Sequence, residues 1–311
     1  MDTMSRGVNW MVVIVLLGAT LLPPNIMAAT YDTNIPVKPI EGSESRQLNE
    51  LLFEAAEKGL TDDVKTLLSE GASVEARDRF GNTALLLAAL SGKYHTVQAL
   101  IDAGSVVNHQ NLIGSTAVYR AAKGGRKRAV KALLAAGADI NLPNKKSLTP
   151  IIAAAYSGNV RLVKLFLEKG ADPTVIDTYG KSAVVYAAGR GFHSIVATLL
   201  DTGIDVNKRY GNDLTVLMWA AGFSNDVPPK DGEETVRMLL DRSADVTLRD
   251  NRGWTALSTA AYRNHDGVIR QLIAAGANPN VRSKQGKTPL DLARSAGSQK
   301  AERVLTEETS G

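Results

Sequence analysis

The sequence predicts an all-α solenoid of about eight helix-turn-helix units, with short β-hairpin tips between them and terminal units that act as caps. Three observations support this prediction. A slot that is usually glycine recurs every 33 residues over most of the chain, a threonine or serine stands two residues after each slot, and alanine follows seven residues after it. A period of this length is the signature of a repeat array, in which each unit buries its apolar face against the next.

The first 29 residues have the pattern of a signal peptide. Arg6 gives a weakly positive start, and the apolar run at 10–22 is too short to span a bilayer comfortably. Two prolines end the run, and Ala28 and Ala29 are small residues suited to cleavage. We therefore expect an exported protein, periplasmic or secreted, with no stable membrane insertion after cleavage; an uncleaved anchor is the alternative. The absence of cysteine suits an oxidising compartment.

Residues 30–46 follow as an extended linker, because Pro36 and Pro39 interrupt any regular element. The repeat domain then covers residues 47–308. In its first unit Glu50 takes the place of the threonine, and the exposed side is acidic and polar. The last unit is truncated and charged. Both ends suit capping units, which must present a polar outer face to water.

The domain between these caps has seven hairpin slots, and their spacing is 33 residues except for one interval of 40. The longer interval indicates an insertion at about residues 225–231, which contains Pro228 and Pro229. This insertion either decorates a binding face or is a tolerated surface loop. The slots are Gly81, Gly114, Ser147, Gly180, Asp213, Gly253 and Gly286.

Each unit between two slots predicts two helices. The threonine or serine caps the first helix by accepting from free backbone N–H groups, and the alanines let that helix lie close to its neighbours. The second helix ends near a glycine, which suits a left-handed C-cap. These glycines are Gly71, Gly104, Gly137, Gly170, Gly203 and Gly276.

This pattern resembles the ankyrin repeat family. The resemblance is carried by "DRFGNTALLLAA" with "AGSVVN" and by "KQGKTPLDLA", and it extends from about Leu48 to Leu305. It implies a protein-binding solenoid, and the exported start resembles that of bacterial periplasmic ankyrin repeat proteins. Members of that kind are linked to stress protection or to the neutralisation of toxins, so an immunity-type role is one alternative that the resemblance implies.

The motifs that could indicate chemistry are weak. Gly180-Lys181-Ser182 lacks the second glycine of a phosphate-binding loop, because Val175 stands five positions before Gly180. The four histidines have no metal-ligand spacing, and no nucleophile motif is present. We therefore expect no enzyme, no catalytic residue, no metal and no cofactor. The basic run Lys123–Lys131 is interpreted as surface charge, with no nucleic-acid partner.

Ankyrin repeat proteins usually bind partners in the concave groove made by the tips and the first helices. At those positions this chain carries cations and aromatic residues, and the corresponding positions contain no carboxylate. We expect the groove to hold an acidic face of a partner protein, since aromatic residues and arginine commonly anchor interfaces. An anionic polysaccharide or lipid is a further alternative. The predicted partner-binding residues are Phe80, Lys123, Lys145, Lys146, Tyr156, Tyr179, Lys181, Arg190, Phe223, Arg252, Trp254, Tyr262 and Arg263.

Overall fold

The computed structural model describes residues 43–309, which form sixteen α-helices and one short 3₁₀ turn, with no strand within that range. The predicted signal peptide and most of the predicted linker lie outside the described residues. The first helix, α1, covers Ser43–Lys58. The prediction that the linker extends to residue 46 was therefore wrong, because its last four residues form the first turn of α1.

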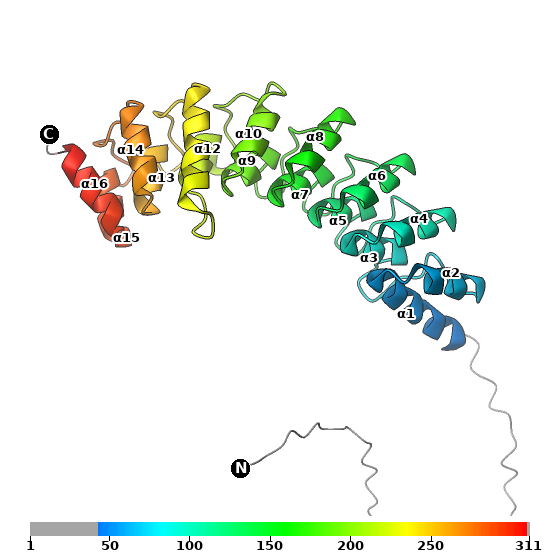
Figure 1. Ribbon diagram of the computed structural model, residues 1–311. Coiled ribbons are helices and arrows are strands. Elements are labelled where there is room, and N and C mark those ends of the chain that lie inside the picture. Colours follow the sequence, from blue (N-terminus) through cyan, green and yellow to red (C-terminus); the bar gives the residue numbers. More distant parts are fainter. Residues whose placement is uncertain (1–42, 310–311) are drawn as a thin grey trace, which may run out of the picture. The chain divides into compact units, whose positions relative to one another are not determined.

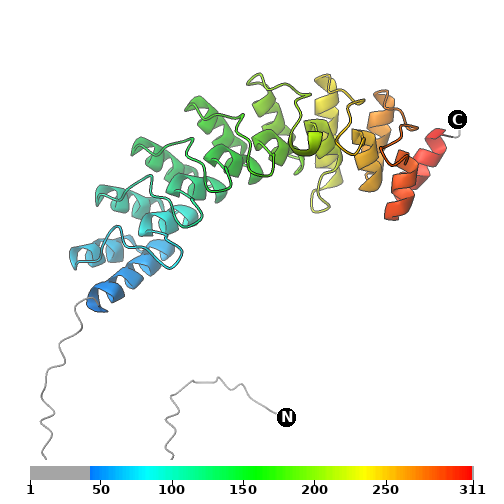
Figure 2. The same cartoon turned by 180° about the vertical axis from the view of Figure 1, so that it is seen from behind.

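The helices alternate between two layers within the repeat array (Figures 1 and 2). Each first helix contacts the first helix of the next unit, and most second helices contact the next second helix. The first helices are α1, α3 (Ala84–Ser91), α5 (Ala117–Lys123), α7 (Pro150–Tyr156), α9 (Ala183–Ala188), α11 (Val216–Ala221), α13 (Ala256–Tyr262) and α15 (Pro289–Ala296). The second helices are α2 (Thr61–Ser69), α4 (Tyr94–Asp102), α6 (Lys127–Ala135), α8 (Val160–Glu168), α10 (His193–Leu200), α12 (Pro229–Asp241), α14 (Asp266–Ala274) and α16 (Gln299–Thr309).

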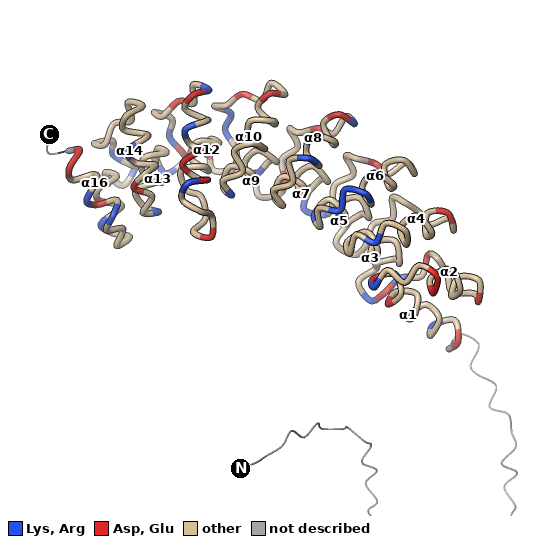
Figure 3. Tube along the Cα trace, in the orientation of Figure 1, with Lys and Arg blue, Asp and Glu red and all other residues tan. Residues whose placement is uncertain are grey.

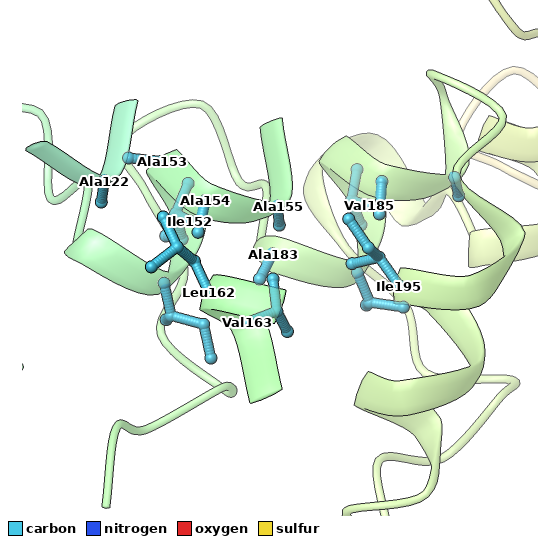
Figure 4. Packing of buried hydrophobic residues seen from close by; sticks show 14 of the residues in the cluster. Ala122, Ile152, Ala153, Ala154, Ala155, Leu162, Val163, Ala183, Val185 and Ile195 are labelled. Carbon is cyan, nitrogen blue, oxygen red and sulfur yellow. The ribbon is translucent and has the colours of Figure 1, made fainter. Parts of the chain in front are cut away.

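The repeated alanines lie in the seam between consecutive first helices. Ala122 of α5, Ala155 of α7 and Ala183 of α9 have no exposed surface (Figure 4). Their small side chains allow the short first helices to lie close together. The second helices bury one apolar stripe against this layer, with Leu162 and Val163 of α8 fully buried. The core is therefore continuous along the array.

The tips between units are tight turns that bond to one another along the array. At one tip, Gly180 has φ of 74°, and its N–H donates to the carbonyl of Asp177 at 3.0 Å. Its own carbonyl accepts from Gly211 N–H of the next tip at 2.8 Å. A side chain at position 180 would bring its Cβ within 2.6 Å of the Gly211 Cα. Glycine is therefore required there by both backbone angle and space.

The threonines and serines that begin the first helices all have extended backbone angles, but only some of them cap by hydrogen bonding. Thr116, Thr215, Thr255 and Thr288 accept from the backbone N–H three residues later. Thr83, Thr149 and Ser182 make no such bond. The prediction of a side-chain cap in every unit was wrong for these three, whose hydroxyls are buried at the seam.

The seven extra residues of the fifth slot interval, between Asp213 and Gly253, are divided between a loop and a longer helix. α12 begins at Pro229 and has 13 residues, compared with nine in α8. The connecting segment 222–228 extends on the first-helix side of the array (Figure 1). Within residues 43–309, none of the helices combines the length and apolar character needed to cross a membrane.

Candidate protein-binding groove

The groove surface is built by two positions of each first helix. These positions lie four and seven residues after the threonine or serine that begins the helix, so they are on the same helical face. In the unit of Ser182 the fourth position is Tyr186, and in the unit of Thr149 the seventh is Tyr156. Their rings are in edge contact, with centroids 5.7 Å apart. Side chains from neighbouring units therefore meet on this face.

A small pocket of about 120 Å³ opens in the middle of this surface. Tyrosines from three consecutive units surround it: Tyr119 of α5, Tyr156 of α7 and Tyr186 of α9. Ala153 lies among them, and the remaining lining residues are Lys123, Leu148 and Ile152. The lining is mainly apolar, with one cation.

Cations lie over the aromatic rings on both sides of this pocket. The Arg190 guanidinium is 4.8 Å from the centroid of the Tyr156 ring. The Lys181 ammonium is 5.5 Å from the Tyr186 centroid and 4.4 Å from that of Trp219. Each contact places positive charge on a ring face, where the π-electrons attract it. The cations are thereby held close to the groove surface.

The Tyr186 ring is fixed by a buried carboxylate beneath the tip. Its hydroxyl donates to the Asp177 carboxylate, and burial, with this hydrogen bond as a second cause, raises the pKa of Tyr186 well above its ordinary value. The same carboxylate accepts from the backbone N–H of Tyr179 at 2.9 Å and of Lys181 at 2.8 Å. The N–H groups that a phosphate-binding loop would offer are therefore occupied by Asp177, which explains why Gly180-Lys181-Ser182 is a structural turn.

The tip beside this carboxylate carries a further cation and ring. The Lys146 ammonium donates to the Tyr179 hydroxyl at 2.7 Å, and this bond raises the pKa of Lys146. Both residues are exposed. Together with the pocket they extend the aromatic and cationic surface across two neighbouring tips.

A second aromatic group lies further along the array. The Trp254 and Tyr262 rings are 5.3 Å apart, and the Arg252 guanidinium lies 3.9 Å from the Trp254 centroid. Arg252 also pairs with the fully buried Asp250 carboxylate at 2.6 Å. Part of the Arg252 charge is thus neutralised within the protein, which leaves Arg263, exposed at the end of α13, as the other cation of this group.

The first unit gives the groove an acidic end. Glu54 and Glu57 of α1 line an open depression of about 640 Å³ together with Asp78 and Phe80. Phe80 is exposed on its tip, and the Arg79 guanidinium lies 4.7 Å from its ring. Figure 3 shows Asp and Glu around α1 and α2, and Lys and Arg at the start of α6. The charge of the groove therefore changes sign along the array. The sequence analysis missed this change, because the positions that it considered did not include the carboxylates of the first unit.

One predicted groove residue is not on the surface. Phe223 is only 3% exposed, and its ring stacks on His265 with centroids 3.8 Å apart. The prediction that Phe223 contacts a partner was wrong, because its ring packs against His265, which precedes α14, and against Gly232 of α12. Gly232 of α12 has no room for a side chain beside this ring.

The other predicted residues line the groove in three places. Six of them are near the central pocket: Lys123, Lys146, Tyr156, Tyr179, Lys181 and Arg190. The second group consists of Arg252, Trp254, Tyr262 and Arg263. Phe80 is at the acidic end. Lys145 is exposed on the tip next to Lys146. The sequence analysis missed Tyr119, Tyr186 and Trp219. The helical period could have found the last two, because each lies four residues after its helix-starting residue.

Other clusters do not indicate chemistry in the described part of the chain. No group of three or more His, Asp or Glu side chains among residues 43–309 could hold a metal ion. His109 is buried with Nε2 2.8 Å from the Gly81 carbonyl, and His265 places Nδ1 3.0 Å from the Ala221 carbonyl, so both are part of the packing.

Comparison with known proteins matches this geometry. The family described as ankyrin repeats in three copies matches residues 52–144, 128–210, 151–250 and 217–310. The E3 ubiquitin-protein ligase KEG of Arabidopsis thaliana is 37% identical over 94 residues, which are 30% of this chain and 6% of that protein. The mitochondrial disaggregase of Bos taurus is 48% identical over 48 residues, 15% of this chain and 7% of that protein.

A third relative is the ankyrin repeat domain-containing protein 63 of Mus musculus, 36% identical over 83 residues, 27% of this chain and 20% of that protein. The chain thus matches one fifth or less of the length of these three relatives. The family match, in contrast, runs from residue 52 to residue 310 and agrees with the stacked helix pairs seen in the structure. The chain belongs to the ankyrin repeat family and is a module for protein–protein interaction.

Proposed function

We propose that this protein is an exported, non-enzymatic binding protein whose groove between α5 and α13 holds an acidic segment of a partner protein. The observation that carries this proposal is the series of aromatic rings that bear cations: Tyr156 with Arg190, Tyr186 and Trp219 with Lys181, and Trp254 with Arg252. Rings give contact area at low entropic cost, and cations beside them attract carboxylates.

We transfer the binding role from the ankyrin repeat family to this protein. We do not transfer the enzymatic activities that the names of two relatives indicate. The aligned residues make up 6% of the ligase and 7% of the disaggregase. Neither fraction supports the transfer of a whole protein's activity. The groove offers rings and cations, which suit binding, and the fold alone does not specify a reaction.

The acidic end of the groove favours a protein partner over the alternative of an anionic polysaccharide or lipid. A long polyanion that followed the whole groove would meet Glu54, Glu57 and Asp78 at the first two units. Like charges at that end would repel it. A partner protein can present carboxylates to the basic part and other groups to the acidic end.

Export is proposed from residues 1–29, which lie outside the described residues. The apolar run and the alanine pair before Thr30 predict a mature protein that begins at Ala29 or Thr30. N-terminal sequencing of the protein from its native cell tests this. Intact Met1 on the bulk of the protein would rule out cleavage there. A stress-protection or toxin-neutralising role then depends on which protein binds.

The groove is tested by selecting a random peptide display library on the full chain. We expect enrichment of acidic peptides, and their binding should weaken strongly in the Arg190→Glu variant because long-range attraction is lost. Trp254→Ala should weaken binding mainly by raising the dissociation rate. If the ring is a buried anchor, the loss of binding free energy is about 2 kcal/mol. Glu168→Lys on the exposed end of α8 is the matched control and should change little.

Two outcomes would contradict the proposal. If Glu168→Lys abolished binding while Arg190→Glu and Trp254→Ala did not, the groove would be the wrong surface. If dextran sulfate or phosphatidylglycerol vesicles bound tightly and the selected peptides did not compete, the ligand would be an anionic polysaccharide or lipid. Binding to such a polyanion should also fall steeply with salt.

A further inference from the structure

The pocket between the three tyrosines exists because one unit carries a small residue where its neighbours carry large ones. Ala153 is the fourth residue after Thr149, and the equivalent positions of the flanking units are Arg120 and Tyr186. Those side chains fill the groove surface of their own units. Alanine leaves that volume open, and Tyr119, Tyr156 and Tyr186 become its walls.

The size of the pocket limits what can enter it. An apolar cavity of about 150 Å³ is known to hold one benzene molecule. The pocket here has a volume of about 120 Å³ and is lined by rings, by Leu148 and Ile152, and by Lys123. One branched aliphatic side chain fits such a space, whereas an indole ring exceeds it.

The rim of the pocket is positively charged on both sides. Lys123 comes from the α5 unit, and Arg190 and Lys181 come from the α9 unit, where they lie over Tyr156 and Tyr186. Packed helices are spaced by 8–10 Å, and an extended chain covers about 3.3–3.6 Å per residue. Carboxylates about three residues before and after a central side chain would therefore reach these cations.

We propose that this tyrosine pocket takes a single leucine or isoleucine side chain of the partner, with aspartate or glutamate about three residues to either side. The inference rests on the proposed function and narrows the partner to an acidic segment with one aliphatic anchor. A polysaccharide has no side chain of this kind. The pocket thus supplies specificity, and the surrounding cations supply attraction.

The test uses three fluorescein-labelled synthetic peptides and the full chain, with fluorescence anisotropy as the measurement. The first has a central leucine flanked by aspartates, the second has alanine at the centre, and the third keeps leucine but replaces the aspartates by lysines. We expect the leucine peptide to bind roughly tenfold more tightly than the alanine peptide, since several methyl and methylene groups are buried. The lysine peptide should bind more weakly than either.

The Ala153→Leu variant separates the pocket from the charge. It fills the pocket from a position where the α3 unit already carries Leu87, so folding should be preserved. In this variant the leucine and alanine peptides should bind equally, and the alanine peptide should bind as it does to the unchanged protein. Circular dichroism and a denaturant midpoint close to that of the unchanged protein verify the fold.

Each other outcome overturns a defined part. The pocket is not the anchor site if the two acidic peptides bind equally to the unchanged protein, or if Ala153→Leu leaves the preference for leucine intact. In either case the proposal that the groove binds acidic segments is not contradicted. If the lysine peptide binds as tightly as the acidic ones, or if no acidic peptide binds at 1 mM or below, on the order of the weakest affinity that such assays resolve, the proposed function fails and the inference with it.

Discussion

At the scale of single residues, two buried alanines of this array differ in the space beside them. Ala188 of α9 is fully buried in the seam between first helices, whereas Ala153 of α7, which is 4% exposed, borders the tyrosine pocket. Ala188→Leu should lower the free energy of unfolding by roughly 1–3 kcal/mol, because the seam has no room for added methylenes. Ala153→Leu should cost less than Ala188→Leu, because the pocket beside Ala153 has room for the added carbons. Urea unfolding of both variants measures the difference; equal midpoints would contradict it.

His265 provides a prediction on pH. Burial lowers the pKa of His265, and this effect exceeds that of the hydrogen bond to the Ala221 carbonyl, which raises it; Arg263 acts with burial and Asp266 against it. The folded protein therefore favours the neutral ring, which stacks on Phe223 and donates from Nδ1 to the Ala221 carbonyl. The pKa of His265 is therefore lower in the folded protein than in the unfolded chain. The stability that the neutral ring contributes is fully present above the unfolded pKa. It is lost as pH falls toward the folded pKa.

We therefore expect the denaturant midpoint to fall as pH is lowered from about 7.5 to 5.5, across the ordinary histidine range. The control is His265→Gln, which should show a smaller dependence in the same window, even if its stability at pH 7.5 is lower. The capping carboxylate Asp291 has a lowered pKa, so its contribution is lost only at more acidic pH. An unchanged slope in His265→Gln would assign the dependence to other groups.

At the scale of elements, the first helices begin in two different ways although they share one sequence pattern. Thr288 of the last unit forms a capping box with Asp291: its hydroxyl oxygen accepts from the Asp291 N–H at 3.2 Å, and the Asp291 carboxylate accepts from the Thr288 N–H at 2.9 Å. The Thr83 hydroxyl makes no cap bond and is buried. The same residue type therefore has different energetic roles at the two helix starts.

Thr288→Val should thus reduce the free energy of unfolding by about 1 kcal/mol, the usual value of a lost N-cap. Thr83→Val should be neutral or slightly stabilising, since it replaces an unpaired buried hydroxyl by a methyl group of similar shape. Thermal unfolding of the two variants in parallel provides the measurement. A larger loss for Thr83→Val would mean that its hydroxyl has a partner in solution.

At the scale of the whole repeat array, the groove has a direction because its charge changes sign. Around the depression at the first two units, the carboxylates Glu54, Glu57 and Asp78 outnumber the one cation, Arg79. The lining of the central pocket has Lys123 and no carboxylate. An acidic ligand should approach the basic part and be repelled by the acidic end. The orientation of the partner is thereby determined by charge, and not only by the pocket.

Glu57→Lys should therefore accelerate association of the acidic leucine peptide by about two- to fivefold at low salt, and the gain should shrink as ionic strength rises. Glu168→Lys makes the same change in net charge on a second helix and should have a smaller effect. Stopped-flow association rates for both variants test this. Equal acceleration would show that only the net charge matters.

The sequence predicted some residues of the groove and missed others. Tyr156 and Tyr179 were predicted on the groove from the repeat register and are exposed there, since each position is determined by its own helix or tip. Tyr186 and Trp219 were within reach of the same argument, because they share the helical face of the seventh position. Their contact with Lys181 needed the tertiary structure, because Lys181 belongs to a tip that lies over both rings.

The sequence by itself determined the repeat, the order of the helices and the family, because a unit of 33 residues repeats its own local pattern of caps, alanines and turns. Only the tertiary structure decided which groove positions are open. Phe223 is buried because its ring stacks on His265 of the next unit, and the pocket at Ala153 depends on tyrosines from units on both sides. The physical reason is that burial is set by neighbours about one repeat away in sequence, which no local pattern specifies.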